Sequence, residues 1–237
     1  MSSIPRHISK QFDNELEDVR GRVLAMGGLV ERQLENAMQS LSSSDAALAQ
    51  SVIETEVQVN TIEVSIDEEC TRILARRQPT AGDLRLITAV IKTITDLERV
   101  GDEAEKVARM AIDLMEQPEN KPYYAGIISL GQLARTILHD ALDAFARMDS
   151  GAALATAGME PKSDEQYGGI MRELITYMME DPRSITSVID AVWVARALER
   201  IADHSRNICE YVIYLVEGKD VRHISIAQME QEVRGQE

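Results

Sequence analysis

Apolar residues recur every three or four positions in two long segments, as they do along the buried face of an amphipathic helix. They are Ile87, Val90, Ile91 and Ile94 in one segment, and Ile185, Val188, Ile189 and Val192 in the other. Each pattern predicts a helix with this stripe in the core. Aromatic residues make up only 4% of the chain, and helix-forming residues dominate the rest, so the sequence predicts an all-α fold.

Turn-forming residues divide the chain into six helical segments. They lie at 42–45, 78–80, 117–122, 150–151 and 181–182, and Gly218 ends the last segment. A further interruption is expected at 160–163, since Pro161 and Ser163 disfavour a continuous helix there.

The two halves of the chain resemble each other. Ala46–Ala49 recurs as Ala152–Ala155, and Leu97–Asp102 recurs as Leu198–Asp203. The sequence therefore predicts two tandem three-helix bundles made of long antiparallel helices. The expected boundaries are a tail at 1–6, a first repeat at 7–116, a linker at 117–122, a second repeat at 123–218 and a tail at 219–237.

Both third helices change their apolar face part-way along. Glu98 and Asp102 continue the first stripe, and Glu199 and Asp203 continue the second. Apolar residues move to another face, at Val100, Ala104, Val107, Ala111 and Leu114 in the first repeat and at Ile201, Ile208, Val212 and Leu215 in the second. Buried unpaired carboxylates are costly, so we expect both acidic faces to be uncovered.

Carboxylates four residues apart lie one turn apart on a helix, where a cation can join them. The acid-x-x-x-Asp spacing occurs at Glu63/Asp67, Glu98/Asp102, Glu160/Asp164 and Glu199/Asp203. The third pair is discounted because of Pro161. Six metal ligands are therefore predicted: Glu63, Asp67, Glu98, Asp102, Glu199 and Asp203. The metal stays open among Mg²⁺, Mn²⁺, iron and Zn²⁺, with oxygen ligands favouring the hard cations.

A solvated acidic face, paired with nearby arginines such as Arg99 and Arg200, explains the same spacing without a metal. A ferritin-like di-iron site is disfavoured, because no histidine follows a glutamate at the Glu-x-x-His spacing.

The formal charge of −15 disfavours binding to nucleic acid, to anionic membranes and to free phosphate, and favours metal cations or basic partners. The two cysteines, Cys70 and Cys209, form no CxxC pair, and neither a secretory signal nor a membrane-length apolar stretch is visible. These features predict a cytoplasmic protein. The absence of a Walker, GxGxxG or GxSxG motif predicts that it is not an enzyme.

Three further features concern surfaces. The compact basic turn with Arg76, Arg77 and Arg85 is a candidate for partner docking, or simply a solvated helix end. Trp193, the single tryptophan, is expected to pack in the core. An apolar stripe on the last helix favours a homodimer and consists of Val194, Ile201, Ile208, Val212 and Leu215.

Together, several of these segments resemble the PhoU family. They are the turn at Arg77–Arg85, the two motifs at Leu97–Asp102 and Leu198–Asp203, the opening Phe12–Leu16 and the later Asn207–Glu210. The resemblance spans roughly residues 7–223. Asn60 stands where family members often carry Asp.

The resemblance implies two PhoU repeats, with metal bound at the acidic motifs in some members. It also implies a negative regulator that connects a phosphate ABC transporter to a sensor histidine kinase, with the transporter's ATPase subunit and the kinase as partners. Two alternatives remain open from the residues alone: a metal-dependent hydrolase or metal-storage protein, and a purely structural helical scaffold.

Overall fold

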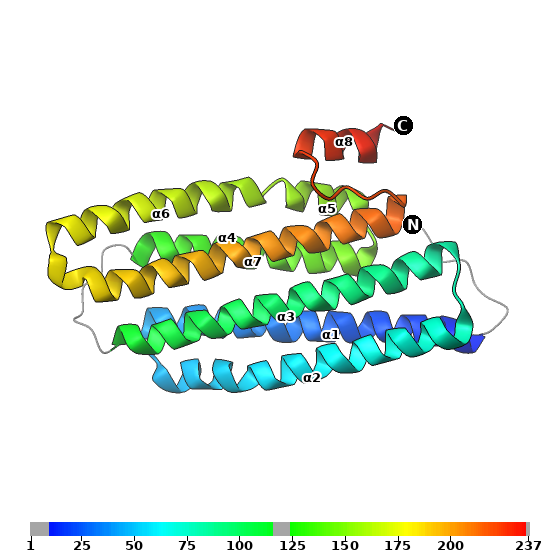
Figure 1. The fold of residues 1–237 in the computed structure, drawn as a ribbon, viewed down its shortest axis with the longest axis horizontal. Coiled ribbons are helices and arrows are strands. Elements are labelled where there is room, and N and C mark those ends of the chain that lie inside the picture. Colours follow the sequence, from blue (N-terminus) through cyan, green and yellow to red (C-terminus); the bar gives the residue numbers. More distant parts are fainter. Residues whose placement is uncertain (1–9, 116–123, 236–237) are drawn as a thin grey trace.

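The computed structural model describes residues 10–115 and 124–235, and the described residues form helices without any strand. The first repeat contains α1 (Lys10–Ser43), α2 (Ala46–Arg77) and α3 (Ala81–Met115). The second contains α4 (Tyr124–Arg147), α5 (Ser150–Ala157), α6 (Glu160–Glu180), the short 3₁₀ helix η1 (Pro182–Ser184) and α7 (Ile185–Glu217). A last helix, α8 (Ile226–Arg234), lies beyond the second bundle (Figure 1). The predicted all-α fold with two three-helix repeats is confirmed.

The same local device starts the second helix of each repeat. The carboxylate of Asp45 accepts a hydrogen bond from the backbone N–H of Leu48, and Asp149 does the same for Ala152. Such caps satisfy N–H groups that the first turn of a helix leaves unpaired. The repeat seen in the sequence is therefore also a repeat of chain turns.

The expected interruption at 160–163 is wrong. The break falls earlier, at Gly158 and Met159, and α6 runs without a gap from Glu160. Pro161 is tolerated because it occupies the first turn, where its missing N–H has no intrahelical partner. The break expected at 150–151 also moves, because Ser150 already starts α5.

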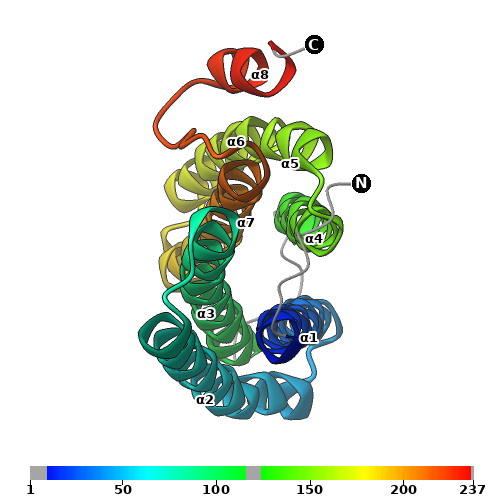
Figure 2. The ribbon, with the colours of Figure 1, turned by 90° about the vertical axis from the view of Figure 1, so that its right-hand side faces the viewer.

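The two repeats pack against each other through α3 and α7, which share the most extensive helix contact in the described chain. Viewed end-on, these two helices lie side by side at the centre, and α1 also approaches α4 (Figure 2). Gly27 permits this second approach, since a Cβ there would lie 2.5 Å from Leu142 Cδ2.

Both changes of apolar face are confirmed as core. Residues such as Val100, Val107, Ile201 and Ile208 are fully buried. The stripe proposed for dimerisation, from Val194 to Leu215, is also buried within the chain, so it is not available to a second copy.

The first stripe of α7 is only partly in the core. Val188 is buried, but Ile185 and Ile189 are exposed, which corrects the sequence expectation. Trp193 is 59% exposed and does not pack in the core as expected.

The segment after Gly218, expected to be a tail, contains α8. Ser225 and Gln228 form a capping box at its start, and Met229 buries its side chain. The expected tail at 1–6 and linker at 117–122 lie outside the described residues. No described helix is long and apolar enough to cross a membrane.

Candidate functional site

Three carboxylates come together in the second repeat. Oxygen atoms of Glu160, Asp164 and Asp203 lie within 4.8 Å of one another. Glu160 and Asp164 lie one turn apart at the start of α6, and Asp203 faces them from α7. Oxygen ligands at this spacing suit a hard cation.

Glu199 adds a fourth acidic group on α7, one turn before Asp203. Burial, followed by the charge of Asp203, raises its pKa to about 7. Its Oε1 contacts Arg196 at 2.6 Å, whereas its buried Oε2 has no hydrogen-bond partner among the described residues. A buried carboxylate oxygen without a donor is the group that a bound cation would satisfy.

Arg206 partly compensates this cluster. It lies 2.7 Å from Glu160 Oε2 and 3.3 Å from Glu210 Oε1. Burial raises the pKa of Glu160, and the hydrogen bond from Arg206 opposes that rise. Burial, together with the charge of Asp164, also raises the pKa of Asp203. The four acids of the cluster therefore outnumber the two arginines, Arg196 and Arg206, that contact them.

The first repeat arranges its acids more loosely. Glu98 and Asp102 are half-buried, and burial is the main cause of the raised pKa of each. The charges of Asp102 and Glu63 raise the pKa of Glu98 further, so α2 does present Glu63 towards α3. Asp67 is exposed to solvent. Within the described ranges, three carboxylates approach within 4.8 Å only in the second repeat.

Glu56, a buried carboxylate on α2, is not among the predicted ligands. Its Oε2 accepts a hydrogen bond from Gln33 Nε2 at 2.8 Å, and its buried Oε1 has no partner among the described residues. Its pKa is raised to about 7, chiefly by burial and also by the charges of Asp102, Glu105 and Glu98, whereas the Gln33 hydrogen bond lowers it. The signal lay in Asn60, because Glu56-x-x-x-Asn60 has the acidic-motif spacing with an amide in the second place.

Gly101 makes room for Glu56 between α2 and α3. A Cβ at this position would lie 2.7 Å from Glu56 Oε2 and 3.3 Å from Gln33 Oε1. A glycine between Glu98 and Asp102 therefore lets the buried acid of α2 approach both acids of α3.

A buried polar network joins the two repeats beside these acids. Asp96 on α3 contacts Nδ1 of His204 at 2.7 Å and accepts hydrogen bonds from Asn207 at 3.1 Å and Tyr211 at 2.8 Å. Its three partners all lie on α7. The network holds the two helices that carry Glu98/Asp102 and Glu199/Asp203 in one fixed relation.

The PhoU domain family matches the chain twice, at residues 23–111 and 127–212. The chain belongs to the PhoU family. The two matches coincide with the two three-helix bundles and include all the acidic residues described above.

Named PhoU relatives are similar over almost the whole chain. The phosphate-specific transport system accessory protein PhoU homolog of Pseudomonas putida is 53% identical over 233 residues, covering 98% of this chain and 91% of the relative. The phosphate-specific transport system accessory protein PhoU of Escherichia coli K12 is 46% identical over 235 residues, covering 99% of this chain and 97% of the relative.

Solved PhoU structures share the fold. The crystal structure of PhoU from Pseudomonas aeruginosa matches with a TM-score of 0.86 and 53% identity, covering 88% of this chain and all of that one. The regulatory protein PhoU from Streptococcus pneumoniae matches with a TM-score of 0.82 and 30% identity, covering 89% and 99% of the respective chains.

The basic turn with Arg76, Arg77 and Arg85 is partly occupied by contacts within the chain. Arg77 makes two hydrogen bonds with Glu15, at 2.8 and 2.6 Å. Arg85 approaches the carbonyl of Leu215 at 3.5 Å, and Arg76 is exposed. Two of the three arginines predicted to dock a partner therefore already have a structural role.

Proposed function

We propose that this protein is a negative regulator of phosphate uptake and phosphate-starvation signalling. In this role it is an adaptor between a phosphate ABC transporter and its sensor histidine kinase. The observation that supports the proposal is the similarity over nearly the full chain, including both PhoU domains, to named accessory proteins of phosphate-specific transport. Its partners are the transporter's ATPase subunit and the kinase.

Deletion of the gene in its host tests this role. We expect genes of the phosphate-starvation response to be expressed even in phosphate-rich medium, and the wild-type gene to restore repression. A deletion strain that still represses these genes in rich phosphate contradicts the regulatory role. Purified ATPase subunit and the cytoplasmic part of the kinase then test the adaptor role directly by binding.

The acidic clusters support a second proposal, that the protein binds metal. Glu160, Asp164, Glu199 and Asp203 form the better-assembled site, and Glu98 and Asp102, with Glu56 and Glu63 nearby, form the other. The donor set is all oxygen, and each cluster includes a buried carboxylate oxygen without a partner, so the residues fit a hard cation such as Mg²⁺, Mn²⁺ or ferric iron.

Metal analysis of the purified protein tests this second proposal. We expect bound metal to fall when Glu160 and Asp203 are changed to amides, with a further loss when Glu98 and Asp102 are changed as well. If the metal-loaded protein hydrolyses phosphoesters, the alternative of a metal-dependent hydrolase replaces the adaptor role.

The arginine turn remains a proposed docking element. Replacing Arg76 alone tests it most cleanly, because Arg77 and Arg85 also hold the fold. We expect Arg76→Ala to weaken binding of the ATPase subunit or the kinase while leaving helicity unchanged. Unchanged binding removes this element from the interface.

A further inference from the structure

Large apolar side chains are exposed mainly at one place in the described chain, around the turn between α6 and α7. They are Ile175, Met179, Ile185, Ile189 and Trp193, with exposures from 41% to 80%. Large exposed apolar groups gathered in one region mark interaction sites on soluble proteins. Tryptophan and methionine are also enriched where proteins bind each other.

Three of these residues form a stripe along one face of α7. Ile185, Ile189 and Trp193 are spaced four residues apart, so they share a face and span about 12 Å along the helix axis. This is a little over two turns of helix, a length that suits another helix lying alongside better than a single inserted side chain.

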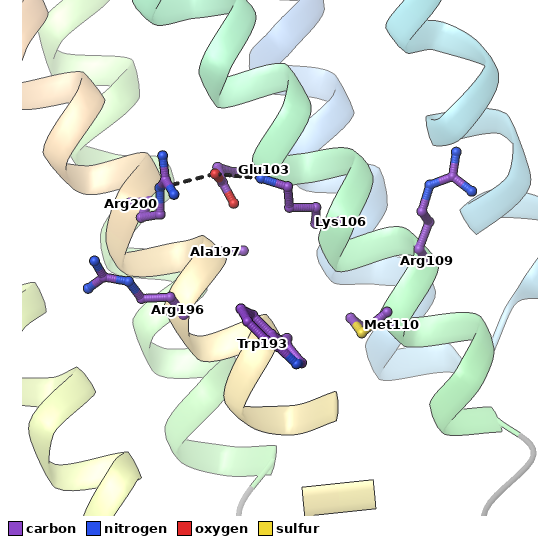
Figure 3. A pocket seen from close by; sticks show the side chains of 8 residues that line it. All are labelled: Glu103, Lys106, Arg109, Met110, Trp193, Arg196, Ala197 and Arg200. Atoms are coloured by element: carbon purple, nitrogen blue, oxygen red, sulfur yellow. Dashed lines mark hydrogen bonds and ion pairs between the residues drawn. The ribbon is translucent and has the colours of Figure 1, made fainter. Parts of the chain in front are cut away.

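The stripe leads into a groove between α3 and α7. Its pocket has a volume of about 260 Å³ and is lined by Trp193, Met110 and Ala197 at one end. Figure 3 shows Trp193 and Met110 across the groove from each other, while Lys106 and Arg200 converge on Glu103 at the other end. The surface thus combines an apolar floor with charged groups beside it.

The charge of this groove is opposite to that of the chain. Glu103 is buried, and its Oε1 lies 2.9 Å from Lys106 Nζ and 3.1 Å from Arg200 Nε. One carboxylate therefore neutralises only one of two cations, whose side chains are 54% and 45% exposed. Arg109 and Arg196 also line the groove (Figure 3), but each already pairs with a carboxylate on its own helix, Glu105 and Glu199 respectively. The uncompensated positive charge of the groove therefore comes from the Lys106 and Arg200 pair.

We infer that this groove, with the stripe that leads into it, is the docking surface for an acidic amphipathic helix of a partner protein. The apolar face of that helix lies on Ile185, Ile189 and Trp193, and its carboxylates lie against Lys106 and Arg200. The inference rests on the proposed adaptor function, because it assigns the surface that one partner covers. It differs from the arginine turn, which lies at the opposite end of α3 (Figure 1).

Other occupants fit less well. A small anion would fill the pocket but leave the stripe of Ile185 and Ile189 uncovered. An anionic membrane or a second copy would set a broad negative surface against the whole of a chain of net charge −15, whereas a single helix meets only the basic groove. A helix placed in a groove, with apolar anchors on one side and charges along the rim, satisfies both parts of the surface.

Affinity measurements with purified ATPase subunit and with the cytoplasmic part of the kinase test the inference. Trp193→Ser should weaken binding of one of them about tenfold or more, as loss of a central aromatic anchor does. Val57→Ser on α2 is a matched control, because Val57 is 69% exposed on a different helix. Circular dichroism checks that both variants keep the wild-type helicity.

The contribution of the groove's positive charge to binding is tested separately. Lys106→Glu combined with Arg200→Glu should weaken the same complex about tenfold or more and remove most of its dependence on salt. Arg72→Glu is the matched control, since Arg72 also pairs with a glutamate three residues away and is equally exposed. Because reversal leaves Glu103 without cations, the milder Lys106→Gln/Arg200→Gln variant is measured beside it and should give a smaller loss in the same direction.

Photo-crosslinking in the host cell identifies the occupant without assuming its identity. A photoreactive residue at Ile189 should crosslink to a segment of another protein that is helical and rich in Asp and Glu, and one at Val57 should not. A crosslink to a second copy, to lipid or to a basic segment overturns the inference, as does no crosslink above the Val57 control.

The two levels of failure are distinguishable. If neither purified partner binds the wild-type protein, the adaptor proposal fails, and the crosslink alone then decides the docking surface. If a partner binds the wild type and binds the Trp193→Ser and charge-reversal variants equally well, the adaptor proposal stands and the docking surface is wrong.

Discussion

Glu56→Gln gives the sharpest test of the acidic face, because it removes one buried charge and keeps the shape of the side chain. The native fold raises the pKa of Glu56 from 4.5 to about 7, mainly by burial. Between these values the folded protein binds more protons than the unfolded chain, so Glu56 makes the protein less stable as pH rises through this window. The Glu56→Gln variant cannot ionise at this position, so it does not lose this stability as the pH rises.

The size of the effect follows from the shift. A rise of about 2.5 in pKa corresponds to a ceiling of about 3.5 kcal/mol, since each unit is worth about 1.4 kcal/mol. Relaxation and residual structure in the unfolded chain lower the observed value, so we expect Glu56→Gln to gain about 2 kcal/mol at pH 8. Near pH 4.5 we expect a difference below about 0.5 kcal/mol, because Glu56 is then protonated in the folded protein and only about half ionised in the unfolded chain.

Urea unfolding of the metal-stripped protein, with chelator present, measures this difference at both pH values. Glu68→Gln is the control, because Glu68 is an exposed glutamate on the same helix. Comparing the variants at two pH values cancels the titration of all other groups. A gain that is the same at pH 4.5 and pH 8, or a loss at pH 8, refutes the assignment of Glu56 as a buried, destabilising charge.

Three further changes test other parts of the structure. Asp203→Asn should slightly raise the melting temperature of the metal-stripped protein, because it relieves repulsion between carboxylates. In differential scanning fluorimetry the same change should remove most of the several-degree rise in melting temperature that saturating Mn²⁺ gives the wild type. A full Mn²⁺-dependent rise in the variant contradicts the metal site. Asp45→Ala should cost about 1 kcal/mol in urea unfolding through loss of the cap on Leu48, and an unchanged midpoint would show that the cap contributes nothing. Asp96→Ala should cost about 2 to 4 kcal/mol in the same assay, because it leaves the buried donors of α7 unpaired; a cost below about 1 kcal/mol means that the network does not hold the repeats together.

The helices could be predicted closely because their ends carry local signals. Asp45 and Asp149 cap two helices, and Gly218 ends a third in the left-handed conformation with φ of 72°. These effects depend only on neighbouring residues, so they can be read from the sequence. Pro161 was misinterpreted because a proline signals a break only in a helix interior, and the sequence did not show that α6 starts one residue earlier.

The faces of the helices were harder to predict. Periodicity shows that Ile185, Val188 and Ile189 lie on one side of α7, but not which part of that side another helix covers. Only the packing of α7 between α3, α4 and α6 decides that Val188 is buried and Ile189 exposed. The same limit applies to Trp193, whose exposure depends on where the groove between α3 and α7 opens.

Only part of the candidate site could be predicted from the sequence, because some of its residues are brought together by tertiary packing alone. Glu98, Asp102, Glu199 and Asp203 stood out because they interrupt an apolar stripe. Glu56 did not stand out, because the residue four positions later is Asn60 rather than Asp. Its burial against Gln33 and Gly101 is a tertiary contact between three helices that no local pattern records.

The net charge of −15 describes the chain but not its individual surfaces. An α-helix that packs on only one side needs one apolar stripe, whereas α3 and α7 each pack against helices of both repeats and so need two. The second apolar stripe of each helix lies on a different face from the first, and carboxylates occupy the line that the first stripe would have continued. Lys106 and Arg200 lie on a further face, where they line the groove. The acidic residues of α3 and α7 and the basic groove thus occupy adjoining faces of the same two helices, linked by the ion pair between Arg196 and Glu199. The proposed cation and the proposed acidic partner helix would therefore meet oppositely charged surfaces of one molecule, although the chain as a whole is strongly negative.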